Sequence, residues 1–286
     1  MTRKRTVPET HRFAHGPHIM GVVNVTPDSF SDGGEFLNAD KAIEHGLQLF
    51  NEGAAILDIG GESTRPGAEV VDVEEEIRRV VPVIEGLASE LKGKGVDISI
   101  DTRNAKTMEA ALKAGATALN DISGLEHDVD SLDVAAEAQV PVFLMHMAGN
   151  PQVMQKKPSY NNVVDEVFQY LQERISICEA RRIDASLLIC DPGIGFGKTV
   201  EHNLLLLRNI KHFHDLGVPV LLGTSRKSFI GKISNDEPAD ERIPGSLSSA
   251  IWGLSQGVQI FRVHDVKETV QAFKIYDAIA SVKEAS

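Results

Sequence analysis

The sequence predicts an α/β fold, a (β/α)8 barrel, because eight short apolar, β-branched runs alternate with segments of helical periodicity. Alternating strands and helices form parallel strands joined by right-handed crossovers. Eight such units in roughly 250 residues match this barrel in count and size. The alternative is an open, doubly wound sheet, which often carries a G-x-G-x-x-G turn after its first strand. Here the first strand continues into NVTPDS (24–29), which favours the barrel.

The predicted elements run through the chain in regular order. The strands lie near 19–23, 55–59, 97–100, 117–119, 141–145, 187–190, 218–222 and 258–263. Apolar residues at i, i+3, i+4 and i+7 predict helices that include 39–50, 74–91, 161–180 and 265–283. We expect residues 18–286 to form a single barrel domain with the catalytic function. Residues 1–17 form an N-terminal extension, expected to be a short leading strand or disordered.

Composition and charge exclude several classes of function. The chain has 286 residues and a net charge of −12, which argues against nucleic acid and anionic membranes as partners because both need a basic face. No apolar run approaches the roughly 18 residues needed to cross a bilayer, and the N-terminus lacks the apolar stretch of a secretory signal. The two cysteines, Cys178 and Cys190, suit a reducing compartment and predict a cytoplasmic protein.

Polar side chains follow nearly every predicted strand. In a barrel of this kind the carboxyl ends of the strands form one rim, where active sites are built. Two rim loops are rich in glycine, GGESTRPG (60–67) and DPGIGFGKT (191–199), and TSRKSFIG (224–231) follows the seventh strand. So many polar groups at one rim indicate a binding or catalytic site. The residues at the strand ends are Asn24, Asp58, Asp101, Asn120, His146, Asp191, Arg262 and His264.

The loop after the first strand carries an apolar residue among polar ones. Phe30 lies between Asp28 and Asp32, and Gly33 and Gly34 end the loop. A loop that closes over a small molecule needs an aromatic lid and flexible hinges. A tight strand-to-helix turn with Phe30 in the core explains the same residues equally well, so the loop alone leaves both interpretations open.

Eight motifs in order carry a specific resemblance to a known family. IMGVVNVTPDSFSDGG, DIGGESTRPG, IDT, NDISG, MHMAGNP, DPGIGFGKT, SRKSFIG and RVHDVKET resemble the dihydropteroate synthases, a pterin-binding family of folate biosynthesis, from about Ile19 onward. The resemblance implies a transferase that condenses 6-hydroxymethyl-7,8-dihydropterin pyrophosphate with p-aminobenzoate. It also implies a Mg2+ cofactor, a dissociative mechanism, small-molecule substrates and a homodimer.

The resemblance implies a pterin pocket formed by several strand ends. A carboxylate is a natural bidentate acceptor for the adjacent amino group and ring N–H of a pterin. The family pattern gives this role to Asp191, with Lys227 donating on the carbonyl side and Met145 packing on the ring face. The implied pterin-binding residues are Asp101, Asn120, Met145, Asp191 and Lys227.

Two further subsites are implied next to the pterin. The pyrophosphate would bind to Asn24, Arg65, Arg262 and His264, and Asn24 would also be the Mg2+ ligand. The p-aminobenzoate pocket would consist of Phe30, Thr64, Pro66, Phe196 and Ser228. The residues expected to carry catalysis are Lys227, Arg65, Arg262, His264 and Asp101.

Three alternatives remain at this stage. A pterin-binding methyltransferase on a related barrel would share the pterin-reading Asp and Asn residues but should lack the segments SRKS and TPDSFSDGG, which are both present. A non-catalytic paralogue that binds pterin should have lost anion or lid residues, yet Asn24, Arg65 and Lys227 are kept. A purely structural barrel does not explain the polar residues at the strand ends.

Overall fold

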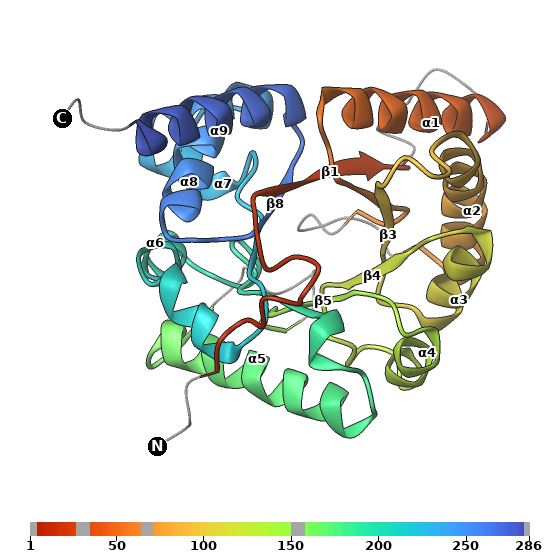
Figure 1. The fold of residues 1–286 in the computed structure, drawn as a ribbon, viewed down its shortest axis with the longest axis horizontal. Helices are drawn as coiled ribbons and strands as arrows, with labels where there is room; N and C mark the ends of the chain where they lie inside the picture. The colour runs from red at the N-terminus through yellow and green to blue at the C-terminus, as the bar shows by residue number, and fades with distance from the viewer. Residues whose placement is uncertain (1–4, 27–34, 64–70, 150–157, 283–286) are drawn as a thin grey trace.

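Eight parallel strands form a barrel inside a ring of helices in the computed structural model (Figure 1). The structure describes residues 5–26, 35–63, 71–149 and 158–282. The hydrogen-bonded order of the strands is β6-β5-β4-β3-β2-β1-β8-β7, and a parallel bridge between Cys190 and Val220 closes the barrel. The strands are β1 (His18–Asn24), β2 (Ile56–Gly60), β3 (Asp97–Asp101), β4 (Ala118–Asp121), β5 (Val142–Met145), β6 (Leu188–Asp191), β7 (Leu221–Leu222) and β8 (Ile260–Val263).

Helices follow the strands in alternation, as the sequence predicts. In α2 the side chain of Asp72 accepts a hydrogen bond from the Glu75 backbone N–H at 2.9 Å, which caps the helix N-terminus. The barrel fold and its eight predicted strands are therefore confirmed. The helices are α1 (Glu35–Glu52), α2 (Val73–Glu90), α3 (Ala105–Ala114), α4 (Ser131–Ala138), α5 (Val163–Ala180), α6 (Val200–Arg208), α7 (Ser228–Ile233), α8 (Ile243–Ser255) and α9 (Val266–Ser281).

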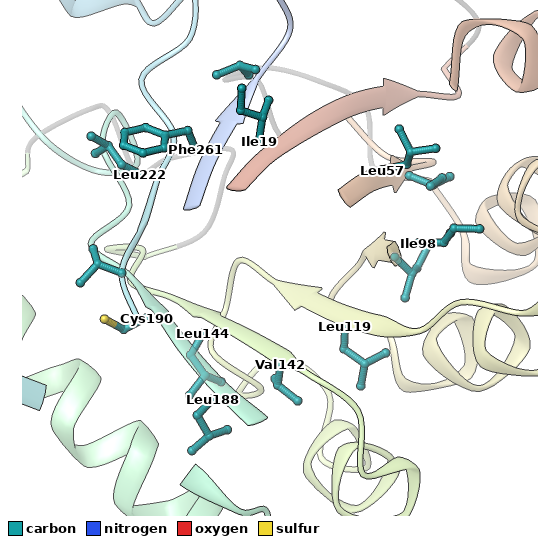
Figure 2. Packing of buried hydrophobic residues seen from close by; sticks show 14 of the residues in the cluster. Ile19, Leu57, Ile98, Leu119, Val142, Leu144, Leu188, Cys190, Leu222 and Phe261 are labelled. Carbon is teal, nitrogen blue, oxygen red and sulfur yellow. The ribbon is translucent and has the colours of Figure 1, made fainter. Parts of the chain in front are cut away.

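The larger hydrophobic core lies between the strands and the helices. Successive side chains of a strand point to opposite faces, so every second residue faces outward. Figure 2 shows such outward-facing side chains, among them Leu57, Ile98 and Leu119, packed between the sheet and its helices. These three residues are at most 3% exposed. This core holds the strand ends in fixed positions around the rim.

The inward-facing residues form a floor at the amino end of the barrel. A separate cluster of buried side chains fills this end, and its members come from seven strands and the N-terminal segment. Two residues further along the strands, the inward positions become polar, as at Asp58, Ser99 and Asn120. The barrel is thus apolar at one end and polar at the other. The floor residues are Phe13, Met20, Ile56, Ala118, Phe143, Ile189, Leu221 and Ile260.

The N-terminal segment closes the apolar end of the barrel. Phe13 is only 3% exposed, and its ring lies 5.1 Å from that of His18 and 6.3 Å from that of Phe143. His11 is also buried and its Nε2 lies 3.3 Å from the Leu188 carbonyl oxygen. The described residues 5–17 contain turns and no strand, and in Figure 1 they run across the ring of strands. The division of the chain at residue 17 stays a prediction.

Candidate active site

Arg262 of β8 lies at the centre of the polar end of the barrel. Its Nε donates to Asp58 Oδ2 and its Nη2 to Asp101 Oδ2, both at 2.6 Å. The three residues come from β8, β2 and β3, so the fold brings together groups that are distant in sequence. Burial works to lower the pKa of Arg262, but Asp58 and Asp101 outweigh it and raise this pKa. Arg262 therefore remains a cation with a fixed orientation.

The predicted pterin-binding residues of β4, β5 and β6 lie in neighbouring strands. Asn120 donates from Nδ2 to Asp58 Oδ2 at 3.0 Å. Met145 is directly paired with Asp191 in the register of β5 and β6, and its side chain is 3% exposed. The Gly193 backbone N–H donates to Asp191 Oδ1 at 2.7 Å, which orients this carboxyl group at the end of β6.

Lys227 and Phe196 form a cation–π pair at the rim. Lys227 Nζ lies 3.8 Å from the centre of the Phe196 ring. The two residues come from the loops that follow β7 and β6, so the predicted residues of the pterin and p-aminobenzoate pockets meet here. A Cβ at Gly195 would lie only 3.0 Å from Lys227 Cδ, so glycine leaves room for the lysine stem.

His264 is buried against the loop that follows β7. The Ser225 hydroxyl lies 3.0 Å from His264 Nδ1 and accepts from the His264 backbone N–H at 3.2 Å. Burial, with the nearby Arg262 and Arg226 charges, lowers the pKa of His264 to about 3. The ring is thus neutral at physiological pH. When the Ser225 hydroxyl donates to Nδ1, the ring proton is on Nε2, where it can be donated to an anion.

A buried lysine supports the loop DPGIGFGK from below. Lys198 Nζ lies 2.9 Å from His146 Nδ1, from the Gly193 carbonyl oxygen and from the Phe196 carbonyl oxygen. Burial lowers the pKa of Lys198 to about 7, and burial with the Lys198 charge lowers that of His146 to about 2. The neutral imidazole therefore accepts a hydrogen bond from the lysine ammonium group. This contact joins the ends of β5 and β6.

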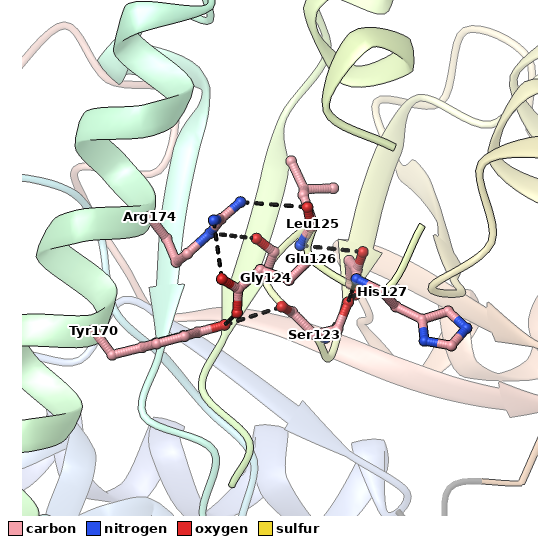
Figure 3. A network of polar contacts seen from close by, with 8 residues as sticks. Ser123, Gly124, Leu125, Glu126, His127, Tyr170 and Arg174 are labelled. Carbon is pink, nitrogen blue, oxygen red and sulfur yellow. Dashed lines mark hydrogen bonds and ion pairs between the residues drawn. The ribbon is translucent and has the colours of Figure 1, made fainter. Parts of the chain in front are cut away.

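Arg174 of α5 holds the loop that follows Asn120 and Asp121. Its Nε donates to the Gly124 carbonyl oxygen at 2.8 Å and its Nη2 to the Leu125 carbonyl oxygen at 3.3 Å (Figure 3). The Tyr170 hydroxyl donates to the Ser123 carbonyl oxygen at 2.9 Å in the same network. Arg174 is 7% exposed, so its hydrogen bonds are shielded from water. The loop is thus held by side chains of a surrounding helix.

The remaining predicted residues divide into two groups. Asn24 is the last residue of β1. A Cβ built on Gly60 would lie 3.9 Å from Asn24 Oδ1 and 3.7 Å from Asp101 Oδ2, so both oxygens lie on the same side of Gly60. Ser228 is exposed and begins the short helix α7. Four predicted residues, Phe30, Thr64, Arg65 and Pro66, lie outside the described residues.

The ionisable groups of the site are poised near neutral pH. Burial raises the pKa of Asp101 to about 7, although the Arg262 charge opposes this shift. Burial also raises the pKa of Asp191 to about 6, against the Gly193 hydrogen bond and the Lys227 charge. Burial and Arg262 lower the pKa of Lys227 to about 8. Strongly shifted groups in one rim are typical of a functional site.

The sequence predicts Asp58 only as one of the strand-end residues, and it assigns no individual role to Asp58, Ser99 or Lys198. Asp58 is fully buried and contacts Asn120 and Arg262, two of the predicted residues. The period-2 alternation of β2, which places Ile56, Asp58 and Gly60 on the inner face, was the signal that could have identified it. Lys198 has no such signal, because its partners are mostly backbone carbonyl oxygens.

Comparison with known proteins identifies the class to which this barrel and site belong. The sequence matches the family described as pterin binding enzyme over residues 20–264, and the chain belongs to this family. Within it, the chain is a member of the dihydropteroate synthases, transferases that condense the pterin pyrophosphate with p-aminobenzoate. It is 48% identical over 268 residues to the dihydropteroate synthase of Escherichia coli K12, covering 94% of this chain and 93% of the relative.

Solved structures agree with this assignment. The dihydropteroate synthase of Xanthomonas albilineans with 4-aminobenzoic acid superposes with a TM-score of 0.88 at 45% identity, covering 94% of this chain and 95% of the other. The same enzyme in complex with 7,8-dihydropteroate gives a TM-score of 0.85 at 42% identity, with 94% and 96% covered. The expected fold and activity are therefore confirmed. Among the described residues, no helix is long and apolar enough to cross a membrane.

Proposed function

We propose that the pterin ring binds at the polar end of the barrel between Asp191, Asn120 and Lys227. The support is the layer of inward-facing polar groups one step above the apolar floor, which contains the Asn120 amide and the Asp191 carboxyl group, with Lys227 in the adjacent loop after β7. Asp191 accepts from the amino group and the ring N–H, and Lys227 donates to the ring carbonyl. Asp101 lies beside them through its ion pair with Arg262, and Met145 packs on the ring face.

The anion and p-aminobenzoate subsites extend outward from this pocket. Arg262 and the neutral Nε2–H of His264 bind the pyrophosphate, and Arg65 adds a second guanidinium group. Phe196 forms a wall for the benzoate ring next to Lys227, with Phe30, Thr64 and Pro66. The hydroxyl group of Ser228 binds the carboxylate. The contact between Lys227 and Phe196 supports a location of this amine between the two substrates.

A Mg2+ ion is compatible with the donors at the rim. The described residues contain no group of three His, Cys, Asp or Glu side chains that could hold a metal alone. Mg2+ typically keeps several waters and takes one or two protein oxygens together with substrate phosphates, so the amide oxygen of Asn24 fits as a single protein ligand. The bound ion would supply positive charge to the pyrophosphate.

The reaction follows a dissociative route in this proposal. The bond between the pterin methylene carbon and the pyrophosphate oxygen breaks, and its electron pair leaves with the pyrophosphate. Arg262 and His264 stabilise this developing negative charge from fixed positions. The amino nitrogen of p-aminobenzoate then bonds to the methylene carbon and loses a proton. Water must be excluded in the interval, so the closing function is assigned to the loops at 24–34 and 61–69, most of whose residues lie outside the described ranges.

Isotope exchange tests this route directly. The substrate is pterin pyrophosphate labelled with 18O at the oxygen that joins the methylene carbon to phosphorus. It is incubated with enzyme and Mg2+ in the absence of p-aminobenzoate. We expect the label to move to non-bridging positions, because reversible bond cleavage lets the pyrophosphate rotate. Full turnover on adding p-aminobenzoate, without any exchange in its absence, would contradict the dissociative step. Addition of EDTA should suppress both reactions.

We also propose that the enzyme is a cytoplasmic homodimer. Helices α6, α7 and α8 surround an apolar pocket of about 680 Å3 at the surface. Leu204, Ile233 and Trp252 line it with 45%, 54% and 46% of their surface exposed, and a second copy would cover them. Both cysteines are buried free thiols, which suits the reducing cytoplasm.

A further inference from the structure

Asp58 is a fully buried carboxylate that contacts three polar side chains of the barrel interior. Its Oδ2 accepts from Arg262 Nε at 2.6 Å and from Asn120 Nδ2 at 3.0 Å. Its Oδ1 accepts from the Ser99 hydroxyl at 2.5 Å. The residue lies in the middle of β2, one inward position below Gly60. Asp58 therefore lies behind the pocket wall and contacts two residues that form it.

The hydrogen bond to Asp58 determines which way the Asn120 amide faces. A carboxylate oxygen in this network only accepts, so the NH2 group of Asn120 must point toward it. The amide is planar, and its Oδ1 consequently points away from Asp58. Asn120 then presents an acceptor to a ligand. The reverse orientation would leave two oxygens in contact and the buried carboxylate short of one donor.

Asp58 also restricts Arg262. The guanidinium group donates from Nε to Asp58 and from Nη2 to Asp101, so two carboxylates fix its plane. A guanidinium group held by two such bonds loses little further freedom when it binds an anion. A single oxygen of Asp58 thus contacts a residue of the proposed pterin pocket and a residue of the proposed pyrophosphate site.

We propose that Asp58 is a positioning residue, which orients the Asn120 amide as an acceptor for the pterin ring and aligns Arg262 for the pyrophosphate. This inference rests on the pterin-binding role proposed for Asn120. Asp58 does not touch the substrates. Replacing it by Asn keeps the volume but supplies an NH2 group, which can donate to Asn120 Oδ1 and turn the amide around.

The test compares D58N with a matched control, D97N. Asp97 is also a buried carboxylate, paired with Arg12 and Thr117, but it begins β3 at the opposite end of the barrel. Titration with 6-hydroxymethylpterin should give a Kd about tenfold or more weaker for D58N, in line with the loss of a charge-assisted hydrogen bond. D97N should bind like the wild type. The KM for p-aminobenzoate should stay unchanged in both variants.

A double-mutant cycle separates this inference from the proposed pterin site. If Asp58 acts through the Asn120 amide, D58N should weaken pterin binding when Asn120 is present. Adding D58N to N120A should cause no further loss of affinity. Equal affinity of D58N and the wild type, or fully additive losses, would overturn the inference. An unchanged affinity of N120A alone would instead contradict the pterin role of Asn120.

A measurement on the wild type covers the case in which D58N fails to fold. In the NMR spectrum of the wild type, the side-chain NH2 signal of Asn120 is assigned by its loss in N120A. The hydrogen bond to the carboxylate should shift this signal and protect its protons from exchange with solvent. A chemical shift typical of a solvent-exposed amide, together with rapid proton exchange, would overturn the inference. This result would not require a variant of Asp58.

Discussion

At the scale of single residues, burial sets the chemistry of this site. Asp191 is 7% exposed, and burial raises its pKa to about 6 despite the hydrogen bond from the Gly193 backbone. Lys227 is affected in the opposite direction, because burial disfavours its charged form and lowers its pKa to about 8. Both groups remain charged over a window around neutral pH, which suits the pterin contacts proposed for them.

The Asp191→Asn variant should lose pterin affinity. The amide cannot accept from both adjacent donors of the ring, and one of them is left without a partner. We expect a loss of about 2–4 kcal/mol in binding free energy, measured by titration calorimetry with 6-hydroxymethylpterin. D97N controls for the removal of a strand carboxylate. An affinity close to the wild type would remove Asp191 from the pterin pocket.

Pterin affinity should depend on pH as a bell-shaped curve. Below the pKa of Asp191, about 6, the carboxyl group is protonated and loses acceptor capacity, so affinity rises as pH passes upward through this value. Above the pKa of Lys227, about 8, the amine is neutral and affinity falls again. Calorimetry from pH 5 to 9 would measure the curve. The acidic limb should vanish in Asp191→Asn; its persistence there would assign the limb to another group.

At the scale of elements, the loop after β6 depends on a backbone shape that only glycine adopts easily. Gly193 has φ of +67°, and a Cβ there would lie 1.9 Å from the His146 carbonyl oxygen. The Gly193 N–H bonds to Asp191, and its carbonyl oxygen accepts from Lys198. The close approach of this loop to the end of β5 therefore positions Asp191.

Gly193→Ala should destabilise the protein more than Gly93→Ala. Both glycines have positive φ, so each substitution costs about 1–2 kcal/mol from the left-handed conformation. Gly93, at φ of +75°, has nothing within 4 Å of a built Cβ, whereas Gly193 also faces a backbone clash. Thermal unfolding should show a small decrease in melting temperature for Gly93→Ala and a larger decrease for Gly193→Ala. Equal decreases would mean that the loop moves aside at no cost.

At the scale of the whole molecule, the proposed dimer predicts the molecular mass of the protein in solution. Sedimentation velocity should give twice the 31.1 kDa of one chain. Leu204→Glu, in α6 at the apolar pocket, should shift the protein toward the monomer because a charge would be buried. Ile279→Glu in α9 is the control, since Ile279 is 70% exposed and lies outside this pocket. A monomeric wild type would contradict the proposal.

The fold could be predicted because its signals are local. Strand alternation and helical periodicity depend on neighbours within one or two turns, and glycines and prolines mark the element ends. The polar residues at the strand ends, such as Asp101 and Asp191, could be predicted for the same reason, because parallel strands bring their carboxyl ends to one rim.

The partners within the site could not be predicted from the sequence. Arg262 was expected to bind an anion, and the structure adds its two carboxylates, Asp58 and Asp101, which lie 204 and 161 positions away in the chain. In the sequence, nothing distinguishes Lys198 from the other residues of its glycine-rich loop. In the structure its ammonium group is buried among backbone carbonyl oxygens. Such pairings depend on strand register and loop path.

By itself, the sequence determined the barrel, the rim that carries the site and the resemblance that the comparisons confirm. Only the tertiary structure decided that His264 is neutral, that Asn120 donates to Asp58, and that Lys227 lies over Phe196. The physical reason is that burial and hydrogen bonding belong to the folded environment. A side chain's type limits its chemistry, and its neighbours then determine its charge, its orientation and its partner.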